Sequence, residues 1–216
     1  LVIISPHAPM YPDAFSGNIA PTFKAGLKEF GDHGTVIPLK ANFLLLDHIQ
    51  RHMRDEKIPF TLSSSEELDY GFTIPLIYLT KNLPNVKLVP LAVSMLDAQA
   101  HYKYGQELKD VIHAENGRVS VIASADLSHH SNAQSPEGYL PEGEAFDKFI
   151  REKAIALDGP ALLAADANML EKAGQSGYKP IVTLAGCLDG MNVNAKELSY
   201  EAPFGVGLMT MRYDLA

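Results

Sequence analysis

Two histidines each lie in a loop that follows a short strand-like run, a position suited to metal binding or proton transfer. His7 lies in the segment 5–9, Ser-Pro-His-Ala-Pro, at the end of the strand-like run 1–5, Leu-Val-Ile-Ile-Ser. His129 ends the segment 124–129, Ser-Ala-Asp-Leu-Ser-His, after the run 118–123. Short, β-branched apolar runs predict buried strands. Ligands in open α/β sheets bind beyond the carboxyl ends of the strands, where a histidine is suited to bind a metal or move a proton.

A structural interpretation of the same residues stays open at this level. Each histidine could simply hydrogen-bond the backbone of its loop, and Asp126 and Ser128 could cap a helix. His130 follows His129 directly, so the two side chains diverge. His48 and His52 stand four residues apart on a predicted helix, a spacing that can bind a metal but equally suits a solvated face.

The elements that would position these loops alternate along the chain. Strands are predicted at 1–5, 35–39, 87–94 and 118–123, with 193–200 and 205–213 as a closing hairpin or two neighbouring strands. Helices are predicted at 43–54, 73–83, 98–114, 144–156, 160–173 and 178–188. Pro75 would lie in the first turn of the second of these, and His101 and His113 are expected to be exposed on the third. This order predicts an α/β single-domain sandwich, with a central mostly parallel or mixed sheet flanked by helices.

Composition limits the classes of function. The 216 residues are 46% hydrophobic and 20% charged, which is ordinary for a globular protein. The net charge of −8 argues against nucleic-acid binding and against an anionic membrane surface. The chain has a single cysteine, Cys187, so no intrachain disulfide is possible, and no apolar run approaches the roughly 20 residues of a membrane span. We expect a cytoplasmic protein.

Three segments in order carry a resemblance to a known family. Residues 4–7 are similar to a metal-histidine motif, residues 122–129 to a Ser-Asp-Leu-Ser-His motif, and residues 198–207 to a C-terminal signature. Together they resemble the class III extradiol dioxygenase, or LigB-like, superfamily. The resemblance is greatest to the Memo and AmmeMemoRadiSam branch, and it covers essentially the whole chain.

The resemblance implies a non-haem Fe(II) centre, with another divalent metal such as zinc as the alternative. Ring-cleaving members hold the iron with two histidines and one carboxylate, which leaves positions open for a catechol and dioxygen. On that pattern His7 and Glu201 are metal ligands and His129 is the catalytic acid or base, although Glu201 could equally be an exposed loop carboxylate. The residues expected to contact the substrate are Tyr70, His130 and Pro9.

Two departures from the family pattern affect the functional prediction. Relatives carry a first metal histidine ahead of His7, so we expect residues 1–216 to be a LigB-like domain that lacks its first N-terminal strand and that ligand. Tyr70 stands where relatives often have the histidine of Asp-His-Gly. The primary hypothesis is an extradiol ring-cleavage dioxygenase that acts on a catechol or related aromatic. The alternative is a Memo-like metal-binding protein of the AmmeMemoRadiSam system, with a radical-SAM partner and no ring cleavage; a homodimer is possible in either case.

Overall fold

A parallel three-stranded unit lies at the centre of the fold in the computed structural model, which describes residues 1–216. Strand β1 (Val2–Ser5) pairs in parallel with β7 (Lys87–Ala92) on one side and with β8 (Val121–Ala123) on the other. Every residue of β1 is buried. The apolar run at the start of the chain therefore forms the buried strand that its composition predicts.

The outer edge of β7 is shared between two groups of strands, which makes the sheet mixed. Its first residues pair in parallel with β4 (Asp32–Ala41), and its last residues pair antiparallel with β2 (Phe15–Asn18). The eight-stranded sheet is completed by β3 (Thr22–Leu27) and β6 (Glu67–Leu68) beyond β4, and by β5 (Phe60–Ser63) beyond β2. The predicted α/β architecture with a mixed sheet is confirmed.

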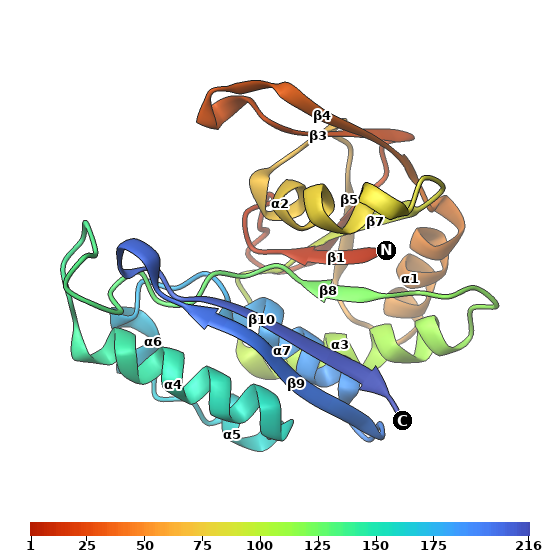
Figure 1. The fold of residues 1–216 in the computed structure, drawn as a ribbon. Coiled ribbons are helices and arrows are strands. Elements are labelled where there is room, and N and C mark those ends of the chain that lie inside the picture. Colours follow the sequence, from red (N-terminus) through yellow and green to blue (C-terminus); the bar gives the residue numbers. More distant parts are fainter.

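Helices cover both faces of the central strands (Figure 1). Because side chains of a strand alternate between its two faces, Val2 and Ile4 enter one hydrophobic core and Ile3 enters another. The first core is closed by α1 (Phe43–Asp55), α3 (Ala98–His113) and the end of α7 (Tyr178–Leu188), and the second by α2 (Tyr70–Leu79). No helix of this fold has the length and apolar character that a membrane span needs.

The C-terminal part of the chain builds a third hydrophobic core together with Tyr102 of α3. It contains α4 (Pro141–Ala156), α5 (Gly159–Leu163), α6 (Ala167–Lys172) and an antiparallel hairpin of β9 (Val193–Glu201) and β10 (Leu208–Leu215). Figure 1 shows this hairpin beside α4. Arg151 of α4 makes a two-pronged ion pair with Glu197 of β9, with N–O distances of 2.8 and 2.9 Å, which fastens the two elements together.

Two glycines let α3 and α7 lie in close contact. A Cβ on Gly105 would stand closer than 3.0 Å to the carbonyl oxygen of Thr183, and a Cβ on Gly186 would meet the carbonyl oxygen of Tyr102 in the same way. Only residues without a side chain permit this approach. The close approach of α7 to α3 therefore depends on these two glycines.

Several element predictions need correction. The helix predicted at 73–83 begins at Tyr70, because Asp69 caps it by accepting from the Gly71 N–H, so Pro75 lies inside the helix rather than in its first turn. The helix predicted at 160–173 is two short helices, since Asp166 caps a new one. His101, expected to be exposed, is completely buried. Strands β2, β3, β5 and β6 were not predicted.

Candidate functional site

The ring of His7 is fixed by contacts from the start of α2. The His7 backbone N–H donates to Ser5 Oγ over 3.1 Å, and Ser5 Oγ donates to Asp69 Oδ1 over 3.2 Å. The Tyr70 hydroxyl lies 2.9 Å from His7 Nδ1, and the two ring centroids are 4.2 Å apart. Gly71 leaves room for this arrangement, because a Cβ there would stand 3.0 Å from the His7 ring. These contacts set the orientation of His7 and leave its Nε2 free of α2.

His7 and His129 converge on one carboxylate, that of Asp126. Because β1 and β8 are parallel neighbours, the loops after them leave the same edge of the sheet. His7 Nε2 lies 3.6 Å from Asp126 Oδ1, and His129 Nε2 lies 2.9 Å from Oδ2. Ser176 also donates to Oδ1. We call His7, Asp126 and His129 the His–Asp–His cluster; its side chains are between 21% and 34% exposed, so solutes can reach them.

The protonation states at the site follow from burial and hydrogen bonding. Burial alone would raise the pKa of Asp126, but interactions with His7, Ser176 and His129 outweigh it and hold this pKa well below its usual range. Burial raises the pKa of Tyr70, and the negative charge of Asp126 adds to the effect. Burial likewise raises the pKa of Asp69. At neutral pH Asp126 is therefore ionised, and the Tyr70 phenol beside His7 is protonated.

The donor atoms of the cluster suit a divalent metal ion. Non-haem Fe(II) proteins bind their iron through imidazole and carboxylate groups, and the cluster offers both kinds of donor. The Tyr70 hydroxyl can accept a hydrogen bond from the Nδ1–H of His7, which leaves the Nε2 lone pair for a metal. A hydrogen bond to the other ring nitrogen is the usual partner of a metal-binding histidine. His7 and Asp126 thus fit iron or zinc by the chemistry of their donor atoms.

A hollow of about 670 Å³ opens beside His7. Met10, Val93 and Leu170 give it apolar walls, and Ser176 and Lys179 contribute polar groups. Ligand pockets commonly combine such walls with a few polar groups. Ser176 also donates to Asp126, so the hollow and the His–Asp–His cluster share a residue.

The remaining residues predicted for the site form no side-chain hydrogen bond or ion pair with the cluster. Glu201 is the exposed last residue of β9, and it forms no hydrogen bond or ion pair with His7, Asp126 or His129. Both ring nitrogens of His130 face the following loop, at Gly138 O (2.7 Å) and the Glu137 carboxylate (3.7 Å). Pro9 is exposed in the loop after β1. Of the predicted site residues, only His7, Tyr70 and His129 are brought together; the roles of the other three stay predictions.

Three residues of the site were not predicted from the sequence. Asp126 lies inside the motif that ends at His129, where it was considered only as a helix cap, so the motif itself contained the signal. Ser176 and Lys179 come from the segment before α7 and its first turn, about 50 residues further on. No local pattern marks them, because their role depends on how α7 packs against the sheet.

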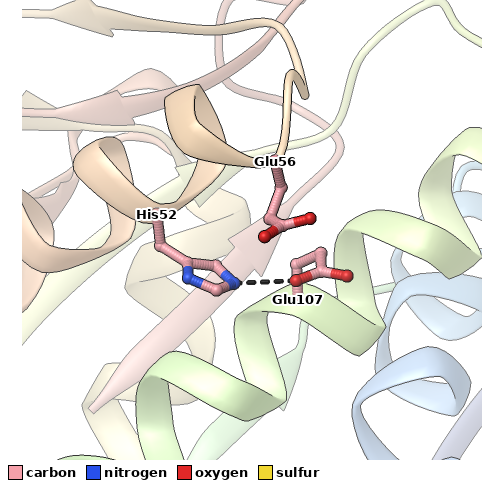
Figure 2. Close-up of side chains that lie close together, drawn as sticks. All are labelled: His52, Glu56 and Glu107. Atoms are coloured by element: carbon pink, nitrogen blue, oxygen red, sulfur yellow. Dashed lines mark hydrogen bonds and ion pairs between the residues drawn. The ribbon is translucent and has the colours of Figure 1, made fainter.

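A second group of metal-ligating side chains lies between α1 and α3 (Figure 2). His52, Glu56 and Glu107 each offer one ligand atom, and these atoms all lie within 4.8 Å of one another. His52 Nε2 is 2.7 Å from Glu107, which also receives a hydrogen bond from Lys103. The group could hold a metal ion, but Lys103 already supplies positive charge to the buried carboxylate. His48, one turn earlier, makes a separate ion pair, so the two histidines do not form one site.

Comparison with known proteins agrees with the fold and shows the family. Residues 1–211 match the family described as the catalytic LigB subunit of aromatic ring-opening dioxygenase, so the chain belongs to the LigB family. This confirms the predicted LigB-like membership and identifies a dioxygenase-like class of protein.

The proteins that are similar to the chain include one from Clostridium acetobutylicum and one from Escherichia coli. The Clostridium acetobutylicum protein CA_C1420 is 27% identical over 223 residues, which cover 99% of this chain and 48% of that protein. The chain thus spans about half the length of this curated relative. The crystal structure of the uncharacterized protein JW3007 from Escherichia coli K12 superposes with a TM-score of 0.68 at 17% identity, covering 97% of this chain and 84% of that one. At this identity the likeness shows the fold alone.

Proposed function

We propose that this protein is a non-haem, Fe(II)-dependent enzyme of the extradiol dioxygenase type that acts on a catechol or related aromatic. The observation that carries the proposal is the convergence of two histidines on Asp126, His7 over 3.6 Å and His129 over 2.9 Å, beyond the ends of two parallel strands. Membership of the LigB family supports it. The apolar hollow beside His7 is of a size that accommodates an aromatic ring.

In this proposal His7 and Asp126 bind the metal. Tyr70 holds the His7 ring through Nδ1 and so directs Nε2 toward Asp126. Iron(II) bound here would supply Lewis acidity toward the catechol hydroxyls and the electron transfer that activates dioxygen. Glu201 remains the predicted third ligand on the family pattern.

His129 is the proposed acid or base. Its Nε2 donates to the ionised Asp126, which leaves a lone pair on Nδ1 that can take the proton of a catechol hydroxyl. The charge of Asp126 stabilises the imidazolium that results, and the same nitrogen can return the proton later. The His129 side chain is 34% exposed, so it is partly accessible to a ligand.

The test is an aerobic assay of the complete, iron-loaded protein with several simple catechols, in which the yellow ring-fission product is followed. We expect colour with at least one catechol. His129→Ala should keep its iron and lose turnover, about 100-fold or more for a proton-transfer residue. His113→Ala, an exposed histidine at the end of α3, is the control and should keep full turnover. Absence of product across the series, or full turnover of His129→Ala, would contradict the proposal, and loss of iron from His129→Ala would show that it is a ligand.

A second candidate is a Memo-like metal-binding protein of the AmmeMemoRadiSam system, acting with a radical-SAM partner and without ring cleavage. The contact of Tyr70 with His7 favours it, because a phenol occupies the place where related ring-cleaving proteins carry an imidazole. Tight binding of iron or zinc without oxygen consumption in the catechol series would support this candidate over the first.

A further inference from the structure

Three side chains with metal-ligating atoms meet between α1 and α3, and none of them belongs to the His–Asp–His cluster (Figure 2). His52 and Glu56 stand four residues apart, so the end of α1 presents both on one face. Glu107 comes from the facing helix α3, and its side chain is only 9% exposed. Two helices thus bring one imidazole and two carboxylates to one position.

The carboxylate of Glu107 is ionised and accepts hydrogen bonds from two sides. Burial alone would raise the pKa of Glu107, but hydrogen bonds from Lys103 and His52 outweigh it and lower this pKa. Because an ionised carboxylate can only accept, the His52 Nε2 that lies 2.7 Å away carries the proton of this contact. A metal ion between the two side chains would replace that proton at Nε2, and the neutral imidazole would then carry its proton on Nδ1.

Negative charge is in excess around this group. Lys103 donates to the second carboxylate oxygen of Glu107, and this hydrogen bond raises the pKa of the lysine. The charges of Glu107, Glu56 and Asp110 raise that pKa further. Three carboxylates therefore act on one ammonium group, whose side chain is 53% exposed and can turn into solvent. Glu56 is also the C-cap of α1, where the partial negative charge of the helix end favours a cation.

We propose that His52, Glu56 and Glu107 form a second metal site, which binds a zinc ion and joins α1 to α3. The imidazole favours zinc over calcium and magnesium, which take oxygen ligands. The three ligand atoms lie within 4.8 Å of one another, and around a tetrahedral zinc ion such atoms are roughly 3.4 Å apart. Small side-chain rotations suffice: the pair at 2.7 Å opens by about 0.7 Å, and the exposed Glu56 moves inward. Water completes the coordination.

The experiment titrates the complete, metal-free protein with Zn²⁺ alone by isothermal titration calorimetry, in the wild type and in His7→Ala, which removes a ligand of the first proposed site. We expect His7→Ala to bind about one zinc ion per chain. Adding His52→Gln should weaken this binding at least about 10-fold. Glutamine can still donate to Glu107, so this change removes the metal-binding nitrogen and keeps the contact between the helices. Lys103→Met removes the competing ammonium and should tighten zinc binding roughly 3- to 5-fold.

His48→Gln is the matched control, because His48 lies one turn earlier on α1 and pairs with Glu115 instead. It should leave zinc binding unchanged. No zinc binding in His7→Ala, full affinity after His52→Gln, an equal loss in His48→Gln, or weaker binding in Lys103→Met would overturn the inference. Equal zinc binding by the wild type and His7→Ala, lost after His52→Gln, would support this site and count only against the one at His7.

Discussion

Gly105→Ala tests the close contact between α3 and α7, which positions Ser176 and Lys179. The added Cβ would lie closer than 3.0 Å to the carbonyl oxygen of Thr183 and 3.0 Å from the backbone nitrogen of Cys187, whereas ordinary contacts begin at 3.4 Å. Both are backbone atoms of α7, so relief requires the helices to separate along their contact rather than one side chain to turn. Such overpacking costs about 3 kcal/mol when it displaces backbone.

The intrinsic preference of alanine for helices offsets part of this loss, about 1 kcal/mol. The net destabilisation is then about 2 kcal/mol, which for a chain of this length lowers Tm by about 4–8 °C. Thermal unfolding followed by circular dichroism measures it. Gly117→Ala is the control, because nothing lies within 4 Å of the added Cβ, and its Tm should not fall. A Gly105→Ala protein with an unchanged or higher Tm would refute the close-packing argument.

Three further predictions concern single side chains. Burial lowers the pKa of His101 to about 4, so the unfolded chain takes up a proton below pH 6.5 that the folded protein does not. The free energy of unfolding should therefore decrease by about 3 kcal/mol from pH 6.5 to 4. Urea unfolding across this range should show a shallower decrease for His101→Gln, and an equal decrease in the variant would contradict the assignment. The hydroxyl of buried Tyr104 has no hydrogen-bond partner, so Tyr104→Phe should raise the free energy of unfolding, measured by urea unfolding, by about 1 kcal/mol. A lower free energy of unfolding in the variant would mean that the hydroxyl does form a hydrogen bond. Tyr70→Phe removes the hydrogen bond to His7 Nδ1 and should weaken metal binding about 10-fold in a chelator competition; unchanged affinity would show that Tyr70 does not orient the ligand.

Periodic and apolar segments could be predicted from the sequence, and short or irregular ones could not. The helix predicted at 43–54 is α1, with its apolar positions buried, because a 3.6-residue period identifies one face of a helix. Strand β2 escaped prediction because its four residues, Phe-Ser-Gly-Asn, have neither alternation nor an apolar run. It forms a strand because β5 and β7 pair with it from distant parts of the chain.

The residues of the candidate site also fall into those that could be predicted from the sequence and those that could not. His7 and His129 were predicted because each follows a recognisable strand within a motif. Asp126 was considered only as a possible helix cap, because its position relative to His7 is not apparent from the sequence. Lys179 falls in the helix predicted at 178–188, and no local pattern distinguishes it there. Its proximity to the hollow depends on the packing of α7 against α3, which no local pattern encodes.

The iron content of His7→Ala tests the proposed metal site most directly. The complete protein and the variant are loaded anaerobically with Fe(II), freed of excess metal and measured by elemental analysis, with His113→Ala as the control. Because His7 is the proposed ligand whose Nε2 faces Asp126, the wild type and the control should retain about one iron per chain, and His7→Ala should retain less than about a tenth of that. Iron retained equally by His7→Ala, or no iron in the wild type, would contradict the proposed site.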